Sequence, residues 1–140
     1  MPARVSHGIT FTGVDKMSRR MKRVYDELPQ KTRDLGRRMA EQILANAKSK
    51  TPVGPTGELQ ASGRIIAGGI SRRGAQQDFL IEFSVLNDGF DYAQIQHDEM
   101  SFHHTVGQAH YLSDAIDEFS KQSAREMLVN LALSLMRDSR

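Results

Sequence analysis

The stretch from Thr51 to Ser62 (TPVGPTGELQAS) constrains the fold more than any other, because it holds two prolines and two glycines. Pro52 and Pro55 cannot continue a helix, since each lacks an N–H and its ring clashes with the preceding turn. The glycines permit backbone angles that other residues resist. Thr56 is expected to cap a one-turn helix at residues 58–60. The stretch therefore predicts a rigid corner that ends one helix and starts a new element, and the simplest case is a helix-to-strand connection.

A long amphipathic helix is expected before this corner. From Val14 onward the apolar residues recur mostly at spacings of three and four, which places them on one face of a helix that ends near Lys48 or Ser49. Pro29 interrupts the pattern, so either the helix kinks there or a second helix begins with Pro29 in its first turn. Because the apolar stripe continues beyond Pro29, one long bent helix is favoured. Residues 1–13 are expected to form an N-terminal arm.

Short strands are expected after the corner. Residues 63–70 and 78–85 have strand-like patterns, and residues 90–97 are the expected return strand. The Asn-Asp-Gly sequence at 87–89 predicts a turn, because these residue types tolerate positive φ. Together these segments predict a small antiparallel sheet of three to four strands.

The rest of the chain is expected to form an extended loop and a helix. Residues 98–109 have no clear period, whereas residues 113–136 have an apolar face and Ser113 as the expected N-cap. The length of 140 residues predicts a single domain, residues 1–140. The predicted fold class is α+β, with a long N-terminal helix, a small sheet and a C-terminal helix, and with both helices on one face of the sheet.

Charge is distributed unevenly along the chain, although the formal net charge is only +2. Between Asp15 and Arg38 nine Lys or Arg face four acidic residues, whereas no Lys or Arg occurs from Gly74 to Ser120. Either the basic and acidic parts face each other within one subunit, or they meet between copies, where complementary potentials fix register. The lack of Cys excludes disulfides and thiolate chemistry. No apolar run is long enough for a signal peptide or a membrane span.

One short interval is rich in side chains that can bind metals: His97, Asp98, Glu99, His103, His104 and His110. Three His and a carboxylate can bind zinc and activate water. The sequence contains no HExxH motif, however, and spacing along an irregular loop does not predict convergence. These residues are therefore expected to order the loop by hydrogen bonds, or to respond to pH near neutrality. The sequence predicts no metal site, no cofactor and no enzymatic activity.

Two motifs follow one another along the chain. The first is the corner, carried by Pro52, Val53, Thr56, Gly57, Leu59 and Ser62. The second is a YA…QHE…H…GxAxYL pattern, carried by Tyr92, Ala93, His97, Glu99, His104, Gly107, Tyr111 and Leu112. In this order they resemble the motifs of small neck proteins of tailed bacteriophages, known as head–tail connector, tail-completion or minor capsid proteins. The resemblance covers roughly Leu35 to Phe119, and the chain departs from it by the longer corner at Gly54 and Pro55 and by Asp98 beside Glu99.

The resemblance implies a structural protein of the virion neck or tail, assembled in the host cytoplasm, rather than an enzyme. Such proteins form homo-oligomeric rings, for which a hexamer or a dodecamer is expected here. The implied partners are portal, adaptor or stopper proteins on one side and tail-tube or terminator proteins on the other. Genomic DNA would pass through the lumen without sequence-specific binding, and no membrane is involved.

The basic helix and the loop after residue 97 supply the candidate contacts with neighbouring subunits or partners. The candidate interface residues are Arg19, Arg20, Arg23, Arg37, Arg38, Asp98, Glu99, Phe102, His103 and His104. Two alternatives from other classes stay open. One is a nucleic-acid-binding protein that uses the basic helix at residues 16–38. The other, less favoured, is a metal-dependent hydrolase that uses the interval from His97 to His110.

Overall fold

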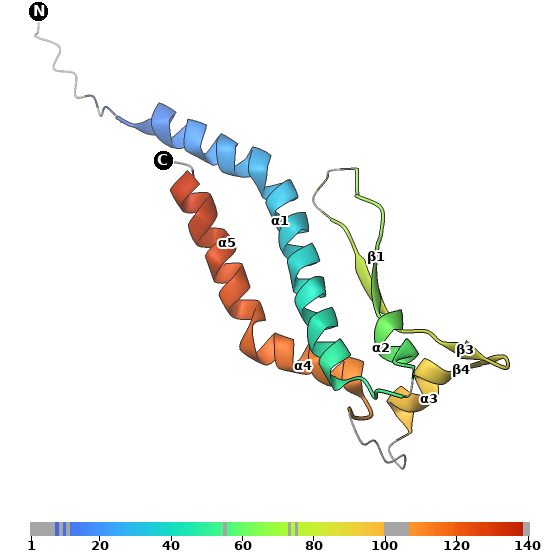
Figure 1. Cartoon of the computed structure of the whole chain (residues 1–140). Coiled ribbons are helices and arrows are strands. Elements are labelled where there is room, and N and C mark those ends of the chain that lie inside the picture. The colour runs from blue at the N-terminus through green and yellow to red at the C-terminus, as the bar shows by residue number, and fades with distance from the viewer. Residues whose placement is uncertain are drawn as a thin grey trace, which may run out of the picture.

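The elements of the chain are helical for the most part. The computed structural model describes residues 8, 10, 12–54, 56–72, 74, 76–99 and 107–138 (Figure 1), and this part is 64% helical. In chain order the elements are α1 (Val14–Lys50), α2 (Glu58–Ser62), β1 (Arg64–Ala67), β2 (Phe79–Glu82), β3 (Leu86–Asn87), β4 (Phe90–Asp91), α3 (Tyr92–Asp98), α4 (Tyr111–Gln122) and α5 (Ala124–Asp138). The predicted mixture of a long N-terminal helix, antiparallel strands and a helical C-terminus is confirmed, although each sheet has only two strands instead of the predicted three to four. Most of the predicted arm at 1–13 and of the predicted loop at 98–109 lies outside the described residues.

Helix α1 is one continuous element of 37 residues. Pro29 lies inside it, where the missing N–H removes one backbone hydrogen bond and favours a bend. Figure 1 shows the helix bending between its N-terminal and C-terminal parts. The prediction of one long bent helix is therefore confirmed. The helix ends where the Thr51 hydroxyl, fully buried, donates a 2.7 Å hydrogen bond to the carbonyl of Ala47.

Helix α1 also separates the strands from the C-terminal helices. On one side it contacts β1 and β2, and on the other side α4 and α5 pack against it (Figure 1). The prediction that both helices cover one face of the sheet is therefore wrong. In β1 and β2 the half-buried Ile65 pairs with the half-buried Ile81, while the exposed Ile66 pairs with the exposed Leu80. This alternation is the period of two expected for strands that are covered on one face only.

The predicted three- or four-stranded sheet is instead two separate antiparallel pairs, β1 with β2 and β3 with β4. The chain leaves the ladder after β2, because residues 83–85 turn toward other partners. The ring of Phe83 lies 5.2 Å from the ring of Tyr111 at a steep angle. The backbone N–H of Val85 donates to Asp91 Oδ1 at 3.3 Å. The first contact is with α4 and the second is with β4, so residues 83–85 do not continue the pairing with β1.

The turn predicted at residues 87–89 is confirmed. Leu86 pairs with Asp91 and Asn87 pairs with Phe90, so Asp88 and Gly89 form a two-residue hairpin loop. Asp88 has φ 49° and Gly89 has φ 82°. Two central residues with positive φ make the tight turn that fits the twist of a hairpin.

The predicted return strand at residues 90–97 is wrong, because the chain becomes helical after two residues. Oδ1 of Asp91 accepts a 2.9 Å hydrogen bond from the N–H of Ala93 and caps the start of α3. The buried residues Ala93 and Gln96 are three apart, which is a helical and not a strand spacing. The alternating residues of this segment predict a strand, but the hydrogen bond that caps α3 favours a helix.

Replacing Asp91 with Ala should lower the free energy of unfolding by about 1–2 kcal/mol, since one carboxylate accepts from two backbone N–H groups and from the hydroxyl of Ser84. Chemical denaturation measures the difference. Asp91→Asn is the matched control, because its amide oxygen can still accept from both N–H groups. Equal losses in the two variants would contradict this assignment.

Two predicted helix caps are also wrong. The C-terminal helix begins at Tyr111, two residues before the expected cap Ser113, and Ser123 divides it into α4 and α5. The residue before α4 is His110, with φ 54°. Helix α2 follows Gly57, with φ 65°, and not a side-chain cap from Thr56. A residue in the left-handed conformation precedes the helix in both places, and side-chain capping rules do not anticipate it.

Candidate functional site

The two sequence motifs, about fifty residues apart in the chain, meet in space. The N–H of Gln108 donates a 2.8 Å hydrogen bond to the carbonyl of Lys50, at the end of α1. A Cβ added to Gly107 would lie 2.5 Å from backbone atoms of Thr51 and Pro52. Glu118 forms a 2.8 Å ion pair with Lys50. The segment that leads into α4 is therefore pressed directly against the corner.

Tyr111 is the centre of this junction. Its side chain is 2% exposed, and its hydroxyl donates a 3.1 Å hydrogen bond to the carbonyl of Ala93. Leu59 of the corner and Ala93 of α3 form the buried core with it, and Phe83 and Leu112 pack against that core. Burial raises the pKa of Tyr111 to about 12, with a smaller contribution from the carboxylates of Asp91 and Asp98. The hydroxyl therefore stays neutral at physiological pH.

Most of the described motif residues hold the fold together. Pro52 is buried, and Gly57 supplies the positive φ before α2. The hydroxyl of Ser62 donates to the carbonyl of Leu59 at 2.7 Å. Val53 and Thr56 are exposed beside the corner. The motifs thus mark a structural junction, and they do not by themselves assemble catalytic groups.

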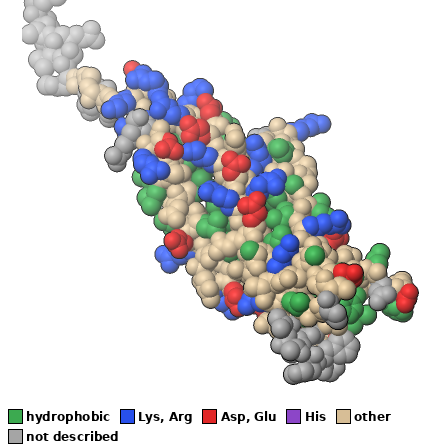
Figure 2. All heavy atoms as spheres, viewed as in Figure 1, with side chains coloured by type: hydrophobic (Ala, Val, Ile, Leu, Met, Phe, Trp, Pro, Cys, Tyr) green, Lys and Arg blue, Asp and Glu red, His purple; other side chains and the backbone are tan. Residues whose placement is uncertain are grey.

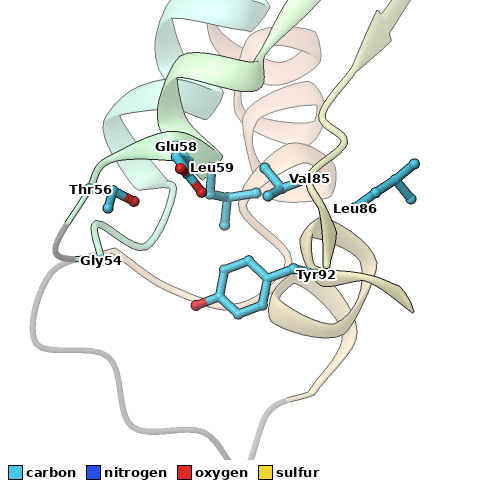
Figure 3. A pocket seen from close by; sticks show the side chains of 7 residues that line it. All are labelled: Gly54, Thr56, Glu58, Leu59, Val85, Leu86 and Tyr92. Atoms are coloured by element: carbon cyan, nitrogen blue, oxygen red, sulfur yellow. The ribbon is translucent and has the colours of Figure 1, made fainter. Parts of the chain in front are cut away.

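A shallow pocket opens beside this junction (Figure 3). Its volume is about 300 Å³, at the lower limit for small-molecule sites. Figure 3 shows the ring of Tyr92 facing Leu59 and Val85, with Leu86 at the rim. The pocket lining is completed by Gly54, Thr56 and Glu58. The pocket thus lies between the corner, the segment that leads into β3 and the start of α3.

The first turns of α1 extend past the C-terminal end of α5 and carry many basic residues (Figures 1 and 2). Residues 14–28 are called the basic segment below. Arg19 and Arg23 are exposed, and Arg20 is half-buried. Most of its apolar residues are also exposed, with Met17 at 60% and Met21 at 66%, while Val24 is half-buried. Positions 14, 17, 21, 24 and 28 follow the alternating three-and-four spacing by which helices pack on other helices.

Arg37 and Arg38 do not belong to the basic segment, although the sequence grouped them with it. The guanidinium of Arg37 lies over the ring of Phe79 in β2, 5.4 Å from its centroid. Arg38 lines a groove between α1 and α5 with Leu35 and Met127. Both side chains are exposed, but they lie beside β2 and α5 of the same subunit and not at the N-terminal end of α1. Three more predicted interface residues, Phe102, His103 and His104, lie outside the described residues.

The opposite end of the molecule is acidic and apolar. This acidic end comprises the β3–β4 hairpin, α3 and the first turns of α4, residues 86–99 and 111–118. It exposes Asp88, Asp98 and Asp117. Leu86 is 76% exposed and Phe90 is 69% exposed. The predicted interface residues Asp98 and Glu99 lie here, at the end of α3, so the structure does not bring them near Arg19 or Arg23 (Figure 1).

The ion pairs of the described residues agree with this separation. Lys22 pairs with Asp26, and Lys31 pairs with Glu27 and Asp138. The acidic end is anchored at Lys50 through Glu118. From Arg23 to Lys50 the helix rises by about 40 Å, at roughly 1.5 Å per residue. Charges so far apart are screened from one another by salt.

Of the six side chains in this interval that could bind a metal, for which the sequence predicts no metal site, the structure brings three together: His97, Asp98 and His110. At the end of α3, the Nδ1–H of His97 donates a 2.7 Å hydrogen bond to Oδ1 of Asp98. Its ring centroid is 5.2 Å from that of His110, which precedes α4. The hydrogen bond with His97 holds the pKa of Asp98 below its usual value. Sequence spacing could not predict this, because twelve residues separate the two histidines along the chain.

Among the described residues, no helix is both long enough and apolar enough to cross a membrane. Comparison with protein-family models, curated proteins and solved structures finds no match to this chain.

Proposed function

We propose that this chain is a structural subunit of a tailed-bacteriophage neck, where copies of it form a ring that joins the head or connector to the tail. A tail-completion, tail-terminator or head–tail joining role fits such a subunit, and it requires no catalysis. Support comes from the order of the two sequence motifs and from the two ends of the molecule. The basic segment and the acidic end each combine charge with exposed apolar side chains.

The separation of these ends carries the proposal. They are complementary in charge, and about 40 Å of helix keeps them from meeting within one chain. The basic segment of one copy can meet the acidic end of the next. Such a head-to-tail contact is heterologous, and it closes into a ring when the rotation between copies is a simple fraction of a turn. A hexamer or a dodecamer satisfies this condition.

In the assembled neck, the acidic end faces either a neighbouring subunit or the lumen. The sequence has no Lys or Arg between Gly74 and Ser120, so a lumen lined by this interval would repel phosphate. Genomic DNA would then pass without sequence-specific binding. Portal, adaptor or stopper proteins and tail-tube or terminator proteins would contact the two faces of the ring.

Reversing the charge of the basic segment should abolish assembly, and reducing the charge of the acidic end should weaken it. Arg19→Glu with Arg23→Glu reverses the basic segment, while Asp88→Asn with Asp117→Lys makes the acidic end less negative. The first variant places like charges at every contact, and the second removes part of the attraction there. Native mass spectrometry measures the distribution of oligomers.

Arg72→Glu with Arg125→Glu is the matched control, because both residues are exposed and lie outside the two ends. This variant should assemble as the unaltered protein does. The proposal fails if the unaltered protein stays monomeric at every concentration and beside tail or connector proteins. It also fails if the variants altered at the two ends assemble normally.

A nucleic-acid-binding protein is the second candidate, and the exposure of Arg19 and Arg23 on one helix favours it. Phosphate contacts would make DNA affinity fall steeply with salt concentration. Binding to duplex DNA measured at several salt concentrations tests this function in the monomer. Arg19→Glu with Arg23→Glu should then weaken binding and reduce the salt slope by about 2.

A further inference from the structure

One cluster at the acidic end combines three side chains that can bind a metal ion. Ligand atoms of His97, Asp98 and His110 all lie within 4.8 Å of one another. The three residues come from the end of α3 and from the position just before α4. The His97 side chain is 21% exposed and that of Asp98 is 60% exposed. The cluster is therefore open to solvent on one side and supported by protein on the other.

The backbone holds the two histidines in place. The N–H of His110 donates a 2.7 Å hydrogen bond to the carbonyl of His97. His110 has φ 54°, a left-handed conformation that few residues other than glycine adopt. Such a conformation persists only where surrounding contacts fix it, and it is found often at binding sites. The centroid of the His97 ring also lies 5.0 Å from that of the buried ring of Tyr111.

The local charge favours a cation. Asp98 supplies a carboxylate oxygen within 4.8 Å of the ligand atoms of both histidines. The sequence from Gly74 to Ser120 has no Lys or Arg to compete with a bound cation.

We infer that His97, Asp98 and His110 bind one transition-metal ion of the zinc class, which clamps the end of α3 to the start of α4. Two imidazoles and a carboxylate are a common ligand set for Zn²⁺, with a water in the fourth position. Bonds of about 2.0–2.1 Å require ligand atoms roughly 3.4 Å apart. The present spread of up to 4.8 Å therefore needs to contract by about 1.4 Å.

A supporting hydrogen bond is already present on His97. Its Nε2 lies 3.2 Å from the hydroxyl oxygen of Ser113, in the first turn of α4. With Nδ1 on the metal, Nε2 carries the proton and donates to Ser113. Metal-binding histidines usually donate their second N–H in this way, which fixes the tautomer and the ring orientation. Ser113, wrongly predicted as a helix cap, thus acquires a role as a positioning residue.

The full-length protein, freed of any affinity tag and of bound metal, should bind one Zn²⁺ per chain in calorimetric titration. Zn²⁺ at a hundredfold excess over Kd should raise Tm by roughly 5–10 °C. Co²⁺ should give the visible absorption of a four-coordinate ion. These measurements do not depend on ring assembly. The zinc site can therefore be refuted while the ring is confirmed, or confirmed while the ring is refuted.

Variants identify the ligands. His110→Asn keeps a residue type that tolerates positive φ, and Asp98→Asn keeps the shape of the side chain. Each should weaken Zn²⁺ binding by at least about 100-fold, because loss of a supporting residue alone costs up to that factor. Asp117→Asn is the control for the loss of one negative charge. His103→Ala with His104→Ala tests the neighbouring histidines, and binding should survive it.

Three results would overturn the assignment. One is the lack of any Zn²⁺ binding at micromolar concentrations. Another is unchanged binding by His110→Asn, provided that this variant unfolds at a normal temperature without metal. The third is loss of binding in the variant that lacks His103 and His104.

Discussion

Replacing Tyr111 with Ala should lower the free energy of unfolding by about 3–5 kcal/mol. Its ring is buried between Leu59, Ala93 and Phe83, so truncation leaves a cavity where α3, α4 and the corner meet. The carbonyl of Ala93 also loses the hydrogen bond from the Tyr111 hydroxyl. Both losses fall at one point that joins three parts of the chain.

Chemical denaturation followed by far-UV circular dichroism measures this loss. Tyr25→Ala is the matched control, since Tyr25 is 78% exposed on α1 and should cost less than about 0.5 kcal/mol. Tyr111→Phe removes only the hydroxyl and should cost about 1 kcal/mol. If Tyr111→Ala cost no more than Tyr25→Ala, Tyr111 would not be the centre of the junction.

The elements that were predicted correctly have strong local signals. Helix α1 shows its apolar stripe over many turns, so Pro29 and Gly36 inside it did not obscure the pattern. The turn at Asp88 and Gly89 was predicted from residue types that tolerate positive φ, and both adopt it. In each case the cause of the structure lies within a few neighbouring residues.

The return strand at 90–97 was predicted wrongly because the hydrogen bonds of a single side chain, Asp91, start a helix there. Asp91 accepts hydrogen bonds from Val85 and Ala93, and these bonds end the hairpin and start α3 within two residues. The pattern of apolar residues in this short segment fits a strand about as well as a helix. The hydrogen bonds that Oδ1 of Asp91 accepts from the backbone favour the helix over the strand.

The sequence predicts which residue types belong to the candidate site, but it does not predict which of these residues lie close together in space. Arg19 and Arg37 lie on the same helix and both are exposed, yet Arg37 lies over the ring of Phe79 while Arg19 belongs to the basic segment. His97 and His110 belong to different elements, and they meet because the N–H of His110 bonds to the carbonyl of His97. The positions of Arg37 and His110 both depend on contacts between residues far apart in the sequence. Spacing along the chain does not predict such contacts.

The exposed apolar stripe of the basic segment has a consequence for stability. Helix α1 buries Leu35, Ala40 and Ala47 in its C-terminal part, whereas Met17 and Met21 stay in contact with water. In the isolated subunit the basic segment is therefore expected to fray first in hydrogen exchange. Burial of this stripe against a neighbouring copy would slow exchange there, and the core of the junction would not change.

Gly107→Ala should lower the free energy of unfolding by about 2–5 kcal/mol, for two separate reasons. Gly107 has φ 91°, which is unfavourable for any residue with a Cβ. Its new Cβ would also lie 2.5 Å from atoms of Thr51 and Pro52. These are backbone atoms at the end of α1, so no flexible side chain can move to relieve the clash.

Gly89→Ala separates the two causes. Gly89 has φ 82°, but a Cβ there meets no atom within 4 Å. It should therefore cost only the conformational penalty, about 1–2 kcal/mol. The excess cost of Gly107→Ala then measures how tightly the segment before α4 is pressed against the corner. Equal costs in the two variants would mean that this segment is free to move away from Pro52, and the junction between the two motifs would then not be rigid enough to hold His110 beside His97.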